Sequence, residues 1–127
     1  MPHARIDLHR HHQPRLAELS AAILEGMVRG FEMPADDLFQ IFRLHDVGEL
    51  VYSPTFPNQE RDDIIFIELL ANVGYSSEQK QDTMIAIADE VEKLGIKRDN
   101  VMLMVIEVQR DWHAPDKNWH ELQQKPA

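Results

Sequence analysis

The chain has 127 residues, of which 43% are hydrophobic, and its 13 basic and 22 acidic side chains give a net charge of −9. This length supports one domain with a single core, over residues 1–127, and the negative charge argues against nucleic acid or an anionic membrane as a partner. The chain has no cysteine, which excludes disulfides and thiolate metal sites. It has no apolar run of the length that a signal peptide or a membrane span requires, so we expect a cytoplasmic protein.

The first half of the chain predicts a strand, a helix and a second strand. Residues 3–8 alternate between polar and apolar, which is typical of a half-buried strand. From Pro14 onward, apolar residues recur at steps of three and four, as on one face of a helix: Leu16, Leu19, Ile23, Met27 and Phe31. Pro34 ends this helix, and the apolar run LFQIFRL at residues 38–44 predicts the second strand.

The second half predicts the same order of elements after an irregular stretch at residues 45–63, in which residues 50–52 are a candidate short strand. IIFIELL at residues 64–70 is nearly all apolar, as expected of a strand buried on both faces. Ser76 and Gln79 have the spacing of a helix capping box, and the helix they begin ends at Gly95. VMLMVIEV at residues 101–108 is the last predicted strand.

The two halves resemble an internal repeat. Adding 63 to a residue number carries Phe31 to Leu94 at the helix ends and Leu38 to Val101 at the strand starts. A helical crossover joins parallel strands, so each half predicts a βαβ unit. We therefore expect an α+β fold in which two tandem units, at residues 3–44 and 64–108, form a four-stranded mixed sheet with both helices on one face. Residues 109–127 would be a tail.

One face of such a sheet has no helices to cover it. The runs IIFIELL and VMLMVIEV are nevertheless apolar on both faces, and a short domain has no third layer with which to bury them. We therefore expect other copies of the chain to cover this face, which predicts a homo-oligomer.

Several short segments carry a resemblance to a known family: Pro2 behind the initiator methionine, MPADDLFQIF at residues 33–42, GYSSEQK at residues 74–80 and DW at residues 111–112. Together with the repeated βαβ pattern, they resemble the tautomerase superfamily, and most closely its malonate semialdehyde decarboxylase group. The resemblance implies a homotrimer. It also implies that Met1 is removed from each chain and that the proline amine exposed in this way acts as a general base or acid.

The chemistry of Pro2 is plausible on physical grounds. An α-amino group has an ordinary pKa of about 7.7–8.0, and a base near the working pH is best suited to keto–enol proton transfer. A retained Met1 would turn this amine into an unreactive amide nitrogen. The alternative interpretation is that a proline at position two has no catalytic role.

Two further residues are candidates next to Pro2. Asp37 aligns with the aspartate that the decarboxylase group uses beside its proline, although it could also be a solvated turn residue. Val73 and Tyr75 stand where that group carries two arginines that bind the substrate carboxylate, which counts against malonate semialdehyde as the substrate. Tyr75 could donate a hydrogen bond to a carbonyl or enol oxygen, or it could pack beneath the helix start.

Arg43 and Trp112 complete the candidate substrate-binding residues. A charged residue inside a strand usually has a partner, so Arg43 fits either an ion pair between subunits, which we favour, or a pocket position. Trp112 stands where the family places an aromatic wall of its pocket, and the alternative is that it anchors the tail.

Four histidines lie between His3 and His12, but their spacing does not predict a metal site. A zinc site needs imidazoles that converge on one point, and we expect His9 and His11 to share a strand face while His12 points elsewhere. We predict surface histidines, no metal and no cofactor.

The sequence thus favours a tautomerase in which Pro2 transfers a proton on a small carbonyl or enol compound. The alternative is a non-catalytic or ligand-binding trimer that keeps the fold. Decarboxylase or hydratase chemistry is less well supported, because the paired arginines are missing.

Overall fold

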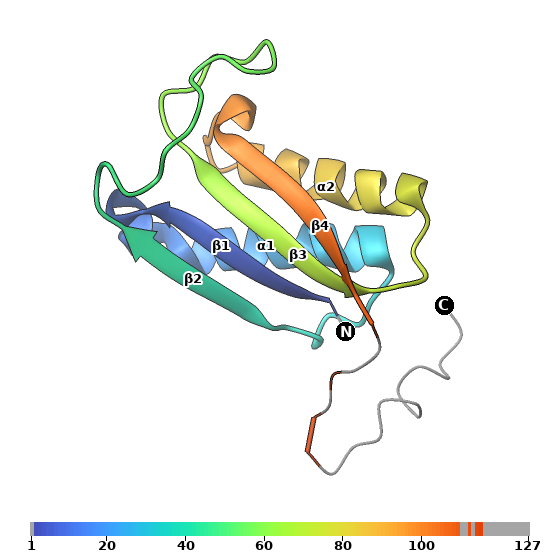
Figure 1. Ribbon diagram of the computed structural model, residues 1–127. Coiled ribbons are helices and arrows are strands. Elements are labelled where there is room, and N and C mark those ends of the chain that lie inside the picture. Colours follow the sequence, from blue (N-terminus) through green and yellow to red (C-terminus); the bar gives the residue numbers. More distant parts are fainter. Residues whose placement is uncertain (1, 110–111, 113, 116–127) are drawn as a thin grey trace.

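The computed structural model describes residues 2–109, 112 and 114–115. In chain order the elements are β1 (His3–His9), the 3-10 helix η1 (Arg10–Arg15), α1 (Leu16–Phe31), β2 (Gln40–His45), β3 (Ile65–Asn72), α2 (Ser77–Glu92), the 3-10 helix η2 (Arg98–Asn100) and β4 (Val101–Val108). Figure 1 shows four strands side by side with both helices behind them.

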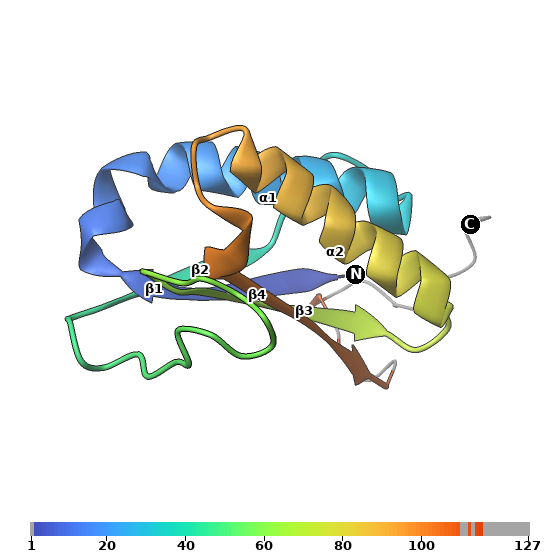
Figure 2. The same cartoon turned by 90° about the horizontal axis from the view of Figure 1, so that it is seen from above.

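The strands form one mixed sheet in the order β2-β1-β3-β4. β1 pairs with β2 and β3 pairs with β4 in parallel, whereas β1 and β3 are antiparallel. Each parallel pair is joined through a helix, and both helices cover the same face of the sheet (Figure 2). The predicted α+β fold of two βαβ units is therefore confirmed.

The core lies between the helices and the sheet. The inward-facing residues of β1, Ala4, Ile6 and Leu8, are fully buried, as are Leu19 and Ile87 on the two helices. The alternation in β1 and the three- and four-residue spacing in α1 produce this layer directly. The Ser76 hydroxyl accepts the Gln79 backbone N–H at 3.0 Å, which confirms the predicted cap at the start of α2.

The opposite face of the sheet carries exposed apolar side chains. In β4, Leu103 and its inward neighbours pack on the core, so Met102 and Met104 project to the other side and are 38% and 53% exposed. Ile41 of β2 is 48% exposed on that side, and Phe39, just before β2, is 51% exposed. The expectation of an uncovered apolar face is therefore met in the single chain.

Some predicted boundaries were wrong. Residues 50–52 form no strand; they belong to the connection between β2 and β3, which lies on the side of the sheet away from the helices in Figure 2. Pro14 lies in η1, so α1 starts two residues later than predicted, and β2 starts at Gln40 rather than Leu38. These shifts make the repeat offset 61 residues, from Leu16 to Ser77 and from Gln40 to Val101, instead of 63.

β3 alternates between buried and half-buried residues in the single chain, apart from its two buried last residues. Its burial on both faces was predicted to need other copies of the chain and stays a prediction. Within the residues that the structure describes, no helix is both long enough and apolar enough to cross a membrane. The predicted tail at residues 109–127 lies mostly outside the described residues.

Candidate active site

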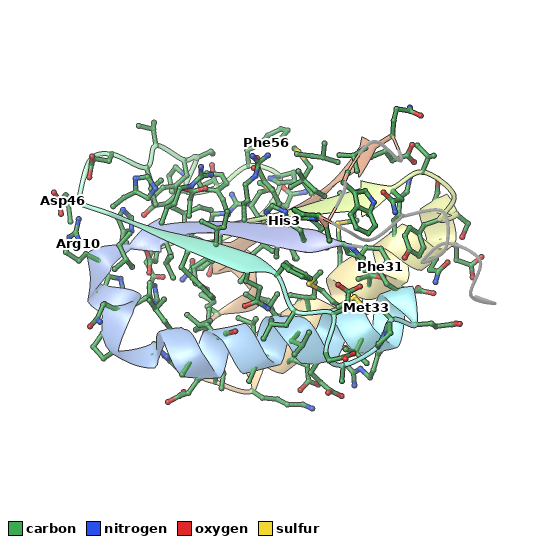
Figure 3. The ribbon with its side chains drawn as sticks, turned by 90° about the horizontal axis from the view of Figure 1, so that it is seen from below. His3, Arg10, Phe31, Met33, Asp46 and Phe56 are labelled. Atoms are coloured by element: carbon green, nitrogen blue, oxygen red, sulfur yellow. The ribbon has the colours of Figure 1, made fainter. Side chains whose placement is uncertain are left out.

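The fold gathers several chain segments at the end of the sheet where β1 begins. β1 and β3 are antiparallel, so the end of β3 lies beside the start of β1, and β4 ends there as well because it is parallel to β3. α1 also ends here: Phe31 and Met33 lie at this end of the molecule, whereas Arg10 and Asp46 lie at the other (Figure 3). We call this the Pro2 end.

Pro2 is buried at the Pro2 end, immediately before β1. The Ala4 backbone N–H donates a hydrogen bond of 3.0 Å to the Phe39 carbonyl. This bond joins the segment after α1 to the start of β1 and brings the neighbourhood of Asp37 beside Pro2. Asp37 itself lies in a tight turn, in which its backbone N–H donates to the Pro34 carbonyl at 3.1 Å.

Tyr75 lies at the same end, in the short connection between β3 and α2. Its ring packs against Phe31, with 4.6 Å between the ring centroids. Burial raises the pKa of the Tyr75 hydroxyl, and the negative charge of nearby Asp37 raises this pKa further. Tyr75 is therefore a protonated hydrogen-bond donor at neutral pH. It also packs against the core, as the second interpretation of this residue expects, and its hydrogen bond to a substrate oxygen stays a prediction.

Trp112 is hydrogen-bonded to Asn72, the last residue of β3. Its indole Nε1 donates a hydrogen bond of 2.9 Å to Oδ1 of Asn72, which is only 4% exposed. This bond holds the Trp112 side chain at the Pro2 end. Asn72 did not emerge from the sequence, although a polar residue that closes an apolar strand was a usable signal.

Arg43 lies elsewhere. Its guanidinium makes two hydrogen bonds to the carboxylate of Asp7 within the same chain, Nε to Oδ1 at 2.9 Å and Nη2 to Oδ2 at 2.8 Å. The Arg43 ion pair that we predicted between subunits is therefore present within one chain. Asp7 is five residues along β1 from Pro2, a distance of about 16 Å at strand spacing, so Arg43 is not brought to Pro2 of its own chain.

The amino-acid sequence of this chain is similar to those of known tautomerases. A family model described as "Tautomerase enzyme" matches residues 37–114. The probable tautomerase YusQ of Bacillus subtilis (strain 168) is 31% identical over 100 residues, which cover 76% of this chain and 79% of the relative. The chain belongs to the tautomerase family.

Solved structures share the fold of this tautomerase-family chain. A malonate semialdehyde decarboxylase is 24% identical, with a TM-score of 0.85 over 95% of this chain and 96% of the other. A fused 4-OT, solved as a symmetric trimer, is 14% identical, with a TM-score of 0.73 over 89% of this chain and 91% of the other. These likenesses confirm the predicted fold, and the family model and the curated relative confirm the predicted superfamily.

The histidines at the other end of β1 form a cluster that the sequence did not predict. His9 Nδ1 lies 2.7 Å from Oδ1 of Asp63, and Nε2 of both His11 and His12 lies near Oδ2, at 3.0 and 2.8 Å. The side chains of His9 and His12 are only 12% and 7% exposed. The expectation of surface histidines without a common partner was therefore wrong, because their partner is 51 to 54 residues away in the sequence.

Proposed function

We propose that this chain is a keto–enol tautomerase whose base and acid is the amine of Pro2, exposed by removal of Met1. The observation that carries the proposal is the convergence of Asp37, Tyr75 and Trp112, from three separate segments, on the end of the sheet where Pro2 is buried. Membership of the tautomerase family supports the same reaction class.

The proposed roles follow from the chemistry of enolisation. The Pro2 nitrogen takes a proton from the carbon next to the carbonyl, and the electrons of that C–H bond form the enol double bond. The carbonyl oxygen becomes an enolate oxygen, which the Tyr75 hydroxyl stabilises by a hydrogen bond; this hydroxyl remains protonated because burial raises its pKa. The Pro2 ammonium then gives its proton to that oxygen, which completes the enol and restores the amine. Asp37 orients the ammonium form of Pro2, which returns its proton in the reverse direction.

The charges at the Pro2 end favour a neutral carbonyl or enol substrate. Asp37 is close enough to Tyr75 for its negative charge to raise the pKa of the Tyr75 hydroxyl. Val73 and Tyr75 offer no positive charge to a carboxylate, and burying an unpaired carboxylate is unfavourable. The related decarboxylase is described as having decarboxylase and hydratase activities; we consider these less suited to this chain for the same reason.

We further propose that the working form is a homotrimer. Phe39, Ile41, Met102 and Met104 are exposed on the sheet face that no helix covers, and a related fused 4-OT was solved as a trimer. Arg43 is half exposed on the same face; to bind substrate in a neighbouring subunit of the trimer, its guanidinium would exchange its hydrogen bonds to Asp7 for bonds to the substrate. The proposed partners are a small carbonyl substrate and further copies of this chain.

The test is a panel of enolisable substrates supplied to the full chain, after its intact mass has shown that Met1 is absent. The panel contains arylpyruvates, neutral aldehydes and ketones, and keto acids. We expect turnover of at least one neutral or weakly charged compound, with a loss of about 100-fold in Pro2→Ala and of about 10-fold or more in Asp37→Asn. If Pro2→Ala turns over as fast as the parent chain, the proposal is wrong. A complete lack of turnover across the panel would favour the non-catalytic trimer.

A further inference from the structure

The cluster at the far end of β1 brings together four side chains of metal-binding type. His9 ends β1, His11 and His12 lie in η1, and Asp63 lies two residues before β3. Asp63 Oδ1 also accepts the Ile64 backbone N–H at 2.8 Å. The end of β1 lies beside the start of β3, because these two strands are antiparallel neighbours in the sheet.

We propose that His9, His11 and Asp63 bind a divalent transition-metal ion of the zinc type, and that His12 holds the carboxylate in place. One ligand atom from each of the first three residues lies within 4.8 Å of the other two. Zinc binds nitrogen and oxygen ligands at about 2.0–2.2 Å, which places tetrahedral ligands about 3.4 Å apart. Small side-chain rotations are therefore sufficient to close the site around an ion.

The donor set selects the kind of metal. Two imidazoles and one carboxylate suit zinc and its neighbours in the first transition row, whereas Mg²⁺ and Ca²⁺ prefer oxygen ligands alone. Three protein ligands leave one tetrahedral position for water. The carboxylate is already held beside the imidazoles, because His9 Nδ1 lies 2.7 Å from its Oδ1 and His12 Nε2 lies 2.8 Å from its Oδ2.

His12 suits a supporting position rather than a ligand position. Its side chain is only 7% exposed, and its Nε2 lies 2.8 Å from Oδ2 of Asp63, so its Nε2–H donates to the carboxylate. Such a hydrogen bond orients the carboxylate toward a metal. His11 is 64% exposed and provides the route by which an ion enters from solvent.

The site is separate from the proposed tautomerase chemistry. His9 lies at one end of β1 and Pro2 at the other, seven residues apart, or about 23 Å at strand spacing. Its test therefore needs no measurement of turnover. A bound ion would also join the end of β1 to the start of β3 and stabilise the folded chain.

The experiment titrates Zn²⁺ into the untagged full chain after dialysis against EDTA and follows the heat of binding. We expect one Zn²⁺ per chain, a rise in the melting temperature, and binding weaker by about tenfold or more in His11→Gln and Asp63→Asn. His45→Gln is the matched control. His45 lies at the same end of the sheet, and its Nε2 is hydrogen-bonded to Oδ1 of Asp7 at 2.7 Å. The affinity of the His45→Gln variant for Zn²⁺ should match that of the parent chain.

Two further readouts keep the result decisive. His11 is largely exposed, so His11→Gln should fold normally by circular dichroism even if Asp63→Asn does not. Co²⁺ should give the visible absorption of a low-symmetry nitrogen and oxygen site in the parent chain and lose it in His11→Gln. If Zn²⁺ does not bind saturably, or binds His11→Gln as tightly as the parent chain, the cluster is only a set of hydrogen bonds and the proposal is wrong.

Discussion

Trp112 donates a hydrogen bond of 2.9 Å from Nε1 to Oδ1 of Asn72, and this bond ties Trp112 to the last residue of β3. Asn72 is 4% exposed, so removal of the indole N–H leaves a buried amide oxygen without that donor. The interaction energy between Trp112 and Asn72 therefore measures how firmly the Trp112 side chain is held at the Pro2 end.

A double-mutant cycle tests this pair. Trp112→Phe and Asn72→Ala should each lower the free energy of unfolding, and the coupling between them should be about 0.5–1.5 kcal/mol. Urea unfolding of the parent chain, both single variants and the double variant measures the coupling. A coupling of zero would show that the bond does not persist in solution.

Tyr75→Phe should slow the proposed proton transfer and leave the fold intact. The ring contact with Phe31, 4.6 Å between centroids, survives the change, and only the hydroxyl that would bind the enol oxygen is lost. Loss of one such donor typically lowers kcat by about 100-fold. The matched control is Tyr52→Phe, which removes a hydroxyl from the connection between β2 and β3 and should retain kcat within about twofold. Equal rates for Tyr75→Phe and the parent chain would remove Tyr75 from the mechanism.

Gly26→Ala should destabilise the fold, although alanine is the better helix former by about 1 kcal/mol. A Cβ on Gly26 would meet the backbone Cα of Ile87 in α2 at 2.6 Å, so the two helices must move apart. Overpacking of this kind costs about 1–3 kcal/mol. The control is Glu25→Ala, at the preceding position, which lies on the exposed side of α1. It should change the free energy of unfolding by less than about 0.5 kcal/mol. Thermal or urea unfolding distinguishes the two variants.

Asp63 should make the chain sensitive to acid. Its pKa is lowered from 3.8 to about 2, with the hydrogen bonds from His9 and His12 opposing its burial. A carboxyl with a lowered pKa in the folded state adds stability above pH 4, and this stability is lost as the pH falls from about 4 to 2. Allowing for partial solvent access, the contribution is about 1–2 kcal/mol.

Urea unfolding from pH 7 to pH 2 in EDTA measures this contribution. Asp63→Asn should be less stable than the parent chain at pH 7, and the difference should shrink below pH 4. Asp46→Asn, which removes the 71% exposed partner of Arg10, should have little effect at any pH. A difference for Asp63→Asn that does not change with pH would contradict the lowered pKa.

Most of the fold could be predicted from local patterns. Three local patterns each predicted an element that is present in the folded chain: the alternation in β1, the helical spacing in α1 and the Ser76 cap of α2. Boundaries were less accurate where local and long-range contacts compete. Leu38 and Phe39 are apolar but precede β2, which begins at Gln40, where its parallel pairing with β1 starts.

The candidate site was only partly predictable. Pro2, Asp37, Tyr75 and Trp112 emerged from the motifs of the family, and the strand order explains how they come to lie at one end. Asn72 and the histidine cluster at Asp63 were missed, because their contacts span 40 and 51 to 54 residues and no spacing rule connects such distant positions. The chemistry of these residues depends on which strand ends meet.

The central claim is that the secondary amine of Pro2 performs the proton transfer. The most direct test compares a chain that begins at Pro2 with a chain that has a single extra glycine before it, each released from a fusion by a protease. The glycine converts the Pro2 amine to an amide, places the new amine one residue away, and leaves every side chain unchanged. We predict that the first chain enolises its substrate and that the second is slower by at least about 100-fold. Equal turnover by the two chains would contradict the account.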